Sequence, residues 1–366
     1  MTRPLPLEDF RFGIEHEFAV AREGRFCDPA TTPFADLQAV VDELPLHPED
    51  YPGLRVGDLG VKRKRWYIEG FERFDPHGRY LRTEPKGFEI RTPICASLDE
   101  AIATLQADTA RWQQVAERHG FRPLRTALNP SRSEYVPEPP LNEWELANRR
   151  SPEERTAHIP MVTFGPDLNL SHPALTTAET IDIGQRLTAA SPFIVPFSFS
   201  SPFADGGAWG GLSRRTHLRT GPRPAVLVHV GSDDDVIPSS PTLTDRARLP
   251  AEVGRIEFKA FDCVSDPELY RALGTLLLGL ALDTTPAARA VVPDAGLHRR
   301  AAFAGFEDAA IADGAAAALR AARAALPAEM AAHLELLAAM LRDRRTPAHA
   351  MLETRRSTGS LLAAIS

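Results

Sequence analysis

Two glutamates alternate with apolar residues in the first strand-like segment of the chain. The segment 11–18 reads Arg-Phe-Gly-Ile-Glu-His-Glu-Phe, so Glu15 and Glu17 are two positions apart. Side chains at this spacing point to the same face of a strand. Two unpaired carboxylates side by side would be unfavourable in an apolar setting, and a hard cation such as Mg²⁺ between them would remove the conflict. A solvated strand edge is the alternative interpretation.

The rest of the apolar pattern predicts a mixture of strands and helices. Alternation and turn residues indicate strands at 61–68, 80–82, 88–92, 161–170 and 255–261. Helical spacing predicts helices at 35–44, 97–119, 177–190 and 267–282. Ser97 stands three residues before Glu100, which is the spacing of a capping box. Residues 191–213 are expected to form a long functional loop, because their five aromatic residues argue against disorder.

The order of these elements predicts an α+β fold. Strands come early, helices follow in mixed order, and there is no regular βαβ spacing, so we expect an antiparallel or mixed sheet with helices on one face. From residue 293 to the end the chain is rich in Ala, Arg and Leu, which predicts a helical C-terminal layer at 293–366 with little chemistry. We expect one catalytic domain over 1–366, with its chemical motifs between residues 11 and 282.

Charged and polar side chains recur at every second position on four of the predicted strands. The sets are Glu15 and Glu17; Glu89 and Arg91; Asp167, Asn169 and Ser171; and Arg255, Glu257 and Lys259. Apolar residues separate the members of each set, so one face of the sheet packs on a core and the other forms a charged basin. In such a basin carboxylates bind metal ions, and arginine or lysine binds phosphate and carboxylate oxygens.

Composition excludes several classes of protein. With 366 residues, 43% hydrophobic and 25% charged, the chain matches ordinary globular proteins. A net charge of −7 argues against nucleic-acid binding as the main function, and the basic segment 61–66 fits a solvated loop or a hairpin near the substrate better. Three widely spaced cysteines favour reduced thiols. The segment 1–9 lacks the features of a secretory signal and the longest apolar run, 276–282, is too short to span a bilayer, so we expect a cytoplasmic protein without a membrane partner.

Familiar nucleotide and metal motifs are absent from the sequence. There is no GxxxxGK[ST] phosphate loop and no GxGxxG dinucleotide fingerprint, so any ATP binding must rely on the charged sheet. His16 lacks the second histidine of a zinc-protease helix. His16 should also point away from Glu15 and Glu17, as a packed or surface histidine.

Several segments resemble the glutamate-cysteine ligase family, particularly its carboxylate-amine ligase branch. The opening Gly-Ile-Glu-His-Glu-Phe and the segment 88–101 are similar to that family's first strand and to its strand-to-helix segment. Ala-Ser-Pro-Phe at 190–193, Gly-Leu-Ser-Arg-Arg-Thr at 211–216 and Thr-Gly-Pro at 220–222 follow in family order, and Gly-Arg-Ile-Glu-Phe-Lys at 254–259 resembles the closing metal-binding strand. The matches extend from about residue 12 to residue 282.

The resemblance implies a glutamine-synthetase-like fold and an ATP- and Mg²⁺-dependent ligase. Such an enzyme forms an acyl phosphate, usually on the γ-carboxyl of glutamate, and joins it to an amine such as cysteine. Carried over by position, the metal-binding residues would be Glu15, Glu17, Glu89, Asp167 and Glu257. Lys259 and Arg214 would bind phosphate or substrate carboxylate, Arg91 would orient Glu89 or meet the substrate, and Arg255 and Asn169 would complete the nucleotide site.

Two departures from the family pattern leave alternatives open. The strand at 161–171 carries Asp167 where the family usually has histidine, and Lys259 replaces an expected arginine, which keeps the charge and loses the bidentate fork. A guanidine phosphotransferase of the same fold and a non-catalytic nucleotide-binding or ligand-binding relative therefore remain as alternatives. The expected partners are small amino acids or amines. The aromatic loop at 193–209 gives a weak indication of a homo-oligomer interface.

Overall fold

The fold is built around one large mixed sheet. The computed structural model describes residues 5–50, 65–285 and 287–366. The strands are β1 (Arg11–Arg22), β2 (Arg25–Phe26), β3 (Trp66–Phe74), β4 (Tyr80–Arg91), β5 (Phe121–Leu124), β6 (Pro166–Ser171), β7 (Phe203–Ala204), β8 (Gly207–Ala208), β9 (Val226–Val230), β10 (Thr244–Arg246) and β11 (Ile256–Phe258). The order in the sheet is β10-β9-β11-β6-β1-β4-β3, with β2 and β5 paired to β1. Only the β9–β10 pair among these described strands is parallel, which confirms the predicted mixed α+β class.

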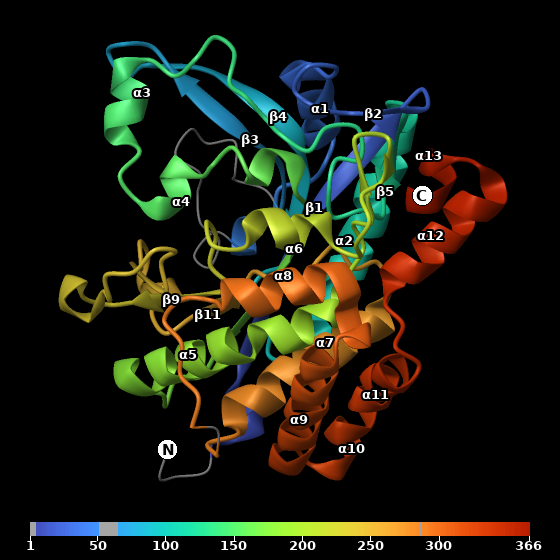
Figure 1. Ribbon diagram of the computed structural model, residues 1–366. Coiled ribbons are helices and arrows are strands. Elements are labelled where there is room, and N and C mark those ends of the chain that lie inside the picture. The colour runs from blue at the N-terminus through green and yellow to red at the C-terminus, as the bar shows by residue number, and fades with distance from the viewer. Residues whose placement is uncertain (1–4, 51–64, 286) are drawn as a thin grey trace.

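Long helices pack on the face of the sheet opposite its charged side chains, and three short helices contribute residues to the charged face. The helices are α1 (Phe34–Asp42), α2 (Leu98–Arg118), α3 (Glu143–Asn148), α4 (Pro152–Arg155), α5 (Thr177–Ile194), α6 (Arg214–Arg219), α7 (Pro267–Leu282), α8 (Ala295–Ala304), α9 (Ala309–Ala325), α10 (Ala328–Ala331), α11 (Glu335–Arg342), α12 (Pro347–Thr358) and α13 (Leu361–Ile365). Helix α2 packs on β1, and α5 packs on β9 and β11. Figure 1 shows the β3–β4 hairpin at one end of the molecule and helices α9, α10 and α11 at the other.

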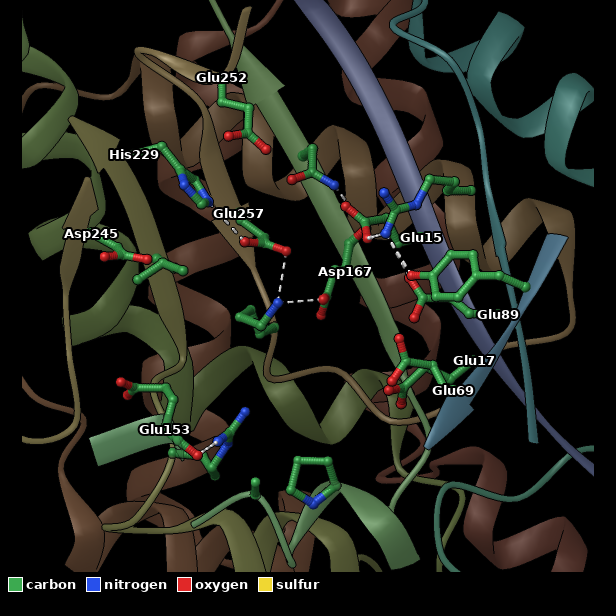
Figure 2. A pocket seen from close by; sticks show the side chains of 18 of the residues that line it. Glu15, Glu17, Glu69, Glu89, Glu153, Asp167, His229, Asp245, Glu252 and Glu257 are labelled. Atoms are coloured by element: carbon green, nitrogen blue, oxygen red, sulfur yellow. Dashed lines mark hydrogen bonds and ion pairs between the residues drawn. The ribbon is translucent and has the colours of Figure 1, made fainter. Parts of the chain in front are cut away.

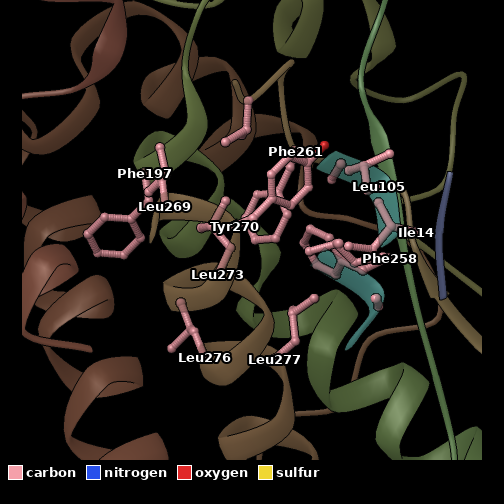
Figure 3. Close-up of a cluster of buried hydrophobic side chains, with 14 of the residues drawn as sticks. Ile14, Leu105, Phe197, Phe258, Phe261, Leu269, Tyr270, Leu273, Leu276 and Leu277 are labelled. Carbon is pink, nitrogen blue, oxygen red and sulfur yellow. The ribbon is translucent and has the colours of Figure 1, made fainter. Parts of the chain in front are cut away.

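The core lies between the sheet and these helices. Ile14 of β1, Phe258 of β11 and Leu273 and Leu277 of α7 are all at most 1% exposed and belong to one buried cluster (Figure 3). Burying apolar area of this kind is the main force that fixes the helices against the sheet. Among the described helices none combines the length and apolar character that crossing a membrane requires. The three cysteines are buried free thiols.

Several predicted elements are confirmed with small changes of boundary. Ser97 caps α2, and its side chain accepts a hydrogen bond of 3.1 Å from the Glu100 backbone N–H. The helix predicted at 267–282 is α7, and the Ala-rich C-terminal part forms α8 to α13. Helix α5 continues past the predicted end to Ile194. It tolerates Pro192 because the Ser191 hydroxyl donates to the Thr188 carbonyl that a backbone N–H would otherwise use.

Other predictions were wrong in their boundaries. Strands expected at 80–82 and 88–92 are one strand, β4, which passes Pro85 at an irregularity opposite Gly70. Strand β3 extends to Phe74 instead of ending at residue 68, and residues 61–64 of that prediction lie outside the described part of the chain. Strand β6 begins only at Pro166, and β11 covers only Ile256–Phe258.

The region 191–213 is not the long loop that the sequence predicted. It holds the end of α5, a 3₁₀ turn at Val195–Ser198 and the small β7–β8 hairpin. Phe197, Phe199 and Phe203 are at most 1% exposed. These aromatic side chains belong to the interior, so they are not available for a subunit interface.

Candidate active site

The strand register places the predicted polar residues on one face of the sheet. Glu15 lies opposite Asp167 on one side and Arg91 on the other, and Glu17 lies opposite Glu89. Because side chains alternate along each strand, these neighbours project together. They line a pocket of about 710 Å³, together with the other predicted site residues except Arg214; these further lining residues are Asn169, Arg255, Glu257 and Lys259.

Three glutamates form the strongest candidate for a metal site. Glu17, Glu69 and Glu89 each offer an oxygen, and these oxygens lie within 4.8 Å of one another. Figure 2 shows the three side chains converging at one side of the pocket. We call this set the glutamate cluster. Several carboxylate oxygens in an open pocket are the ligands that Mg²⁺ takes while it keeps positions for water and phosphate, so the residues present fit that ion.

The electrostatics of the glutamate cluster also favour a cation. Burial raises the pKa of Glu89 well above its usual range, and the neighbouring charges of Glu69 and Glu15 raise it further, against the opposing effect of Arg91. Like charges held this close cannot all ionise without positive partners. Lys86 pairs with Glu17 and Arg91 lies 3.7 Å from Glu89, and a bound divalent cation would supply further positive charge to the three carboxylates.

Glu17 is held in position by two contacts from neighbouring segments. The buried Lys86 Nζ donates to Glu17 Oε1 at 2.5 Å and to the Thr163 carbonyl at 2.9 Å. The Gly165 backbone N–H donates to Glu17 Oε2 at 3.0 Å. The carboxylate is thereby oriented from both sides, and Lys86 belongs to the site although the sequence analysis did not select it.

Glu15 is paired with arginines and does not belong to the glutamate cluster. Its oxygens accept from Arg91 Nη2 at 3.0 Å and from Arg255 Nη1 at 3.3 Å. Burial raises the pKa of Glu15, but the two arginines outweigh it and lower that pKa to about 2. The predicted role of Glu15 as a metal ligand is therefore not what this arrangement favours. Arg91 also donates to the Tyr67 hydroxyl at 2.5 Å.

Lys259 bridges two carboxylates on the other side of the pocket. Its Nζ donates to Glu257 at 2.7 Å and to Asp167 (Figure 2). His229 Nε2 lies 3.1 Å from the second oxygen of Glu257. Burial raises the pKa of Asp167 to about 7 despite Lys259, whereas Lys259 and Arg255 hold that of Glu257 well below its usual range against its burial. The structure thus gives Asp167 and Glu257, both predicted metal ligands, an ammonium group as their partner.

Helix α6 places its second arginine, rather than its first, in the pocket. Arg214 lies with its guanidinium 5.5 Å from the centre of the Trp209 ring and does not line the pocket. The pocket instead receives Arg215, Arg219 and Arg223, which follow each other at intervals of four residues; we call them the arginine cluster. Arg215 and Arg219 lie on one face of α6, because positions four apart on a helix point the same way, and Arg223 follows the end of the helix. The structure therefore places Arg215 in the pocket, next to the Arg214 that the sequence analysis selected.

Two more residues of the pocket, Glu69 and Lys86, were missed because they lie outside the predicted strands. Glu69 follows Tyr67 at the alternating spacing of β3, but the predicted strand ended at residue 68. Lys86 falls between the predicted strands at 80–82 and 88–92, although β4 runs through this position. A longer predicted strand would have placed Glu69 on the charged face, two positions after Tyr67. Simple alternation would instead group Lys86 with the core residues Phe88 and Ile90, and Lys86 reaches the pocket because the strand is irregular between Pro85 and Gly87.

The chain matches a known protein family. A sequence model of glutamate-cysteine ligase family 2 matches residues 11–235. No curated protein sequence matches this chain.

Solved structures share the fold at low sequence identity. The glutamate-cysteine ligase of Francisella tularensis in complex with AMP is 12% identical with a TM-score of 0.55, covering 96% of this chain and 85% of that one. A bifunctional glutathione synthetase of Pasteurella multocida is 12% identical with a TM-score of 0.54, covering 98% of this chain and 52% of that one. A chain from the complex of the prokaryotic ubiquitin-like protein Pup and its ligase PafA is 11% identical with a TM-score of 0.50, covering 95% of this chain and 66% of that one. The family match spans more than half of the sequence, and this chain belongs to glutamate-cysteine ligase family 2.

Proposed function

We propose that this protein is an ATP- and Mg²⁺-dependent carboxylate-amine ligase. In this proposal it activates the γ-carboxyl of glutamate as an acyl phosphate and joins it to cysteine or another amine. One observation carries the proposal: a single pocket combines a glutamate cluster that fits Mg²⁺ with lysine and arginine side chains that fit anions. Membership of glutamate-cysteine ligase family 2 supports a ligase of this kind.

The proposed reaction has two steps. A carboxylate oxygen of the acid attacks the γ-phosphorus of ATP, the bond to the β–γ bridging oxygen breaks, and ADP leaves. The amine nitrogen then attacks the acyl carbon, inorganic phosphate leaves, and the nitrogen gives up a proton. The first step is needed because a free carboxylate is a poor electrophile.

The glutamate cluster would hold Mg²⁺, which supplies neutralisation of phosphate charge. Lys259 has three N–H donors, of which Glu257 and Asp167 take two, and the third suits a phosphate or carboxylate oxygen. Arg91 and Arg255 fix Glu15 and so keep the centre of the sheet rigid. Such a site acts by positioning and by electrostatic stabilisation, without a covalent nucleophile.

Release of ADP tests the proposal. The protein is incubated with ATP, Mg²⁺ and pairs drawn from a panel of amino acids and amines, and ADP formation is followed for each pair. At least one pair of acid and amine should stimulate ADP formation and give an amide product. Absence of stimulation by every pair would contradict the ligase proposal, and a phosphoguanidine product would identify a phosphotransferase instead.

A further inference from the structure

Among the described residues, two lysines line the pocket, and they differ in the number of carboxylates that they contact. Lys86 Nζ pairs with one carboxylate, that of Glu17, at 2.5 Å. Lys259 Nζ donates to Glu257 at 2.7 Å and also to Asp167. These two acids come from separate strands, β11 and β6, so the ammonium group of Lys259 joins a pair of carboxylates across the sheet.

The backbone on both sides of the Lys259 side chain is fixed. Lys259 directly follows β11, its N–H donates to the Ala225 carbonyl at 2.8 Å, and its carbonyl accepts from Arg215 Nη2 at 3.1 Å. From this anchored position the side chain reaches Asp167 and Glu257, which converge on its Nζ (Figure 2). The ammonium group is therefore held in place by the strands and does not depend on a ligand.

The group between these two carboxylates is a cation. Burial lowers the pKa of Lys259, but the charges of Asp167 and Glu257 outweigh this effect and raise that pKa above its usual value. An ammonium group is a compact point charge with three donors, so it fits between two carboxylates as a small metal ion does. Mg²⁺ in proteins is commonly bound by one or two carboxylates together with water and phosphate.

Glu15, which lies between this pair and the glutamate cluster in the strand order, is also matched by cations of the protein. Arg91 and Arg255 donate to its two oxygens at 3.0 and 3.3 Å. Three of the carboxylates that the sequence analysis selected as metal ligands, Glu15, Asp167 and Glu257, therefore already contact lysine or arginine.

The glutamate cluster keeps a place for an ion in spite of its cationic neighbours. Lys86 contacts Glu17 and Arg91 lies 3.7 Å from Glu89, yet oxygens of all three glutamates lie within 4.8 Å of one another. No other three acids or histidines lining the pocket meet this distance within the described part of the chain. The geometry thus distinguishes one site with three converging oxygens from one pair of carboxylates that a lysine bridges.

We infer that Lys259 occupies the place of a second metal ion, so that the pocket binds one divalent cation, at the glutamate cluster. The ammonium group supplies the positive charge that an ion would otherwise supply between Asp167 and Glu257. The inference rests on the proposed function only for the identity of the ion as Mg²⁺. The number of ions does not depend on turnover, because it is set by side chains of the free protein.

Counting bound Mn²⁺ in the absence of nucleotide tests the inference. Mn²⁺ takes the same oxygen ligands as Mg²⁺, and electron paramagnetic resonance distinguishes the free ion from the bound ion. A titration of the intact protein therefore gives the number of ions bound per chain. The wild type should bind an ion that Glu89→Gln loses and that Glu257→Gln retains.

Lys259→Ala is the diagnostic variant. It removes the ammonium group and leaves room for an ion with its water ligands beside Asp167 and Glu257, so it should bind one Mn²⁺ more than the wild type. Adding Glu257→Gln to this variant should abolish the gain, because one of the two carboxylates is lost. Mn²⁺ should also raise the melting temperature of Lys259→Ala more than that of the wild type, since an additional ion binds the native state.

Lys86→Ala is the matched control. Lys86 is the other lysine of the pocket, and Glu17 is the one carboxylate within 4.0 Å of its Nζ among the described residues. The glutamate cluster already provides a site beside Glu17, so this variant should bind the same number of ions as the wild type.

Two results would overturn the inference. One is an equal number of bound ions in the wild type and Lys259→Ala, and the other is loss of an ion when Glu257→Gln is introduced into the wild type. A gain of one ion in Lys259→Ala, in a protein that forms no ADP with any pair of acid and amine, would support the inference and refute only the proposed function.

Discussion

The two faces of strand β1 place polar side chains in opposite environments. On the packed face, His16 is 2% exposed, its Nδ1 contacts the Tyr270 hydroxyl, and its Nε2 lies 3.5 Å from Cys263 Sγ. Burial lowers the pKa of His16 to about 3 and raises that of Cys263 to about 12, so all of these groups are neutral at physiological pH. On the pocket face, Glu15 and Glu17 face a set of charged groups that the protein does not fully balance.

The comparison separates polar side chains that stabilise the fold from polar side chains that bind ligands. His16, Tyr270 and Cys263 resemble a catalytic constellation, but they contact one another and require no ligand. The three close carboxylates of the glutamate cluster remain unfavourable until a cation binds. The following variants test this contrast, in order of decreasing expected effect.

Glu89→Gln should have the largest effect on activity. The change removes one ligand of the glutamate cluster and should lower Mg²⁺-dependent ADP formation about 100-fold or more. It also removes the repulsion from Glu69 and Glu15, so the melting temperature should stay the same or rise. Steady-state kinetics at varied Mg²⁺ and a melting curve measure both effects. Exposed Glu117→Gln is the control, and wild-type kinetics in Glu89→Gln would contradict the assignment.

Lys259→Met should lower activity about 10- to 100-fold, because Asp167 and Glu257 lose the cation between them and substrate oxyanions lose a charged donor. Lys259→Arg should retain part of the activity, since it keeps the charge. The ratio of kcat/KM between the two variants measures the contribution of charge. Equal activity of Lys259→Met and the wild type would show that the bridge is structural only.

His16→Phe should affect stability and leave catalysis nearly unchanged. The Tyr270 hydroxyl and the Cys263 thiol would lose their partner, at about 1–3 kcal/mol in the free energy of unfolding. Urea unfolding measures this loss, and kcat/KM should stay within about twofold of the wild type after correction for the folded fraction. A loss of activity with unchanged stability would refute the contrast between the two faces.

His298 should make the fold sensitive to acid. It is buried, contacts the Ser191 hydroxyl at 2.8 Å, and burial lowers its pKa from 6.5 to about 4. Between these two pH values the unfolded chain binds more protons at this residue than the folded chain does. The contribution of His298 to the free energy of unfolding is therefore complete above pH 6.5, and it is lost as the pH falls towards 4, by up to about 1.4 kcal/mol per pH unit. His298→Gln should flatten this part of the stability curve without abolishing it, since His16 contributes in the same direction. An unchanged slope in urea titrations from pH 4 to 7 would contradict the prediction.

Arg214→Met should have the smallest effect. Arg214 contacts Trp209 and His217 outside the pocket, so kcat/KM and Mg²⁺ dependence should stay within about twofold of the wild type. A loss comparable to that of Lys259→Met would restore the sequence-based assignment of this residue.

The sequence predicts the charged face well because strand periodicity is a local property. Alternation alone groups Glu15 and Glu17, and it places Asp167 and Glu257 on the same face. Capping residues likewise fix the start of α2 at Ser97. These features depend on neighbours within a few positions, which the sequence displays directly.

Features that depend on tertiary context were harder to predict. The sequence does not indicate that Glu15 is paired with Arg91 and Arg255, whereas Glu69 from β3 completes the glutamate cluster. Nor does it show that Arg215, rather than Arg214, faces the pocket, because a helix of six residues gives too weak an apolar pattern to fix its orientation. Packing across the sheet determines which of several similar charged residues each side chain contacts.

Nucleotide affinity measured with and without Mg²⁺ tests the central claim most directly, namely that the glutamate cluster holds a metal ion which binds the nucleotide. The affinity of wild type and Glu89→Gln for a non-hydrolysable ATP analogue is compared in each condition. We predict that Mg²⁺ increases the affinity of the wild type at least about tenfold and that this increase is absent in Glu89→Gln. An equal increase in both proteins would contradict the claim.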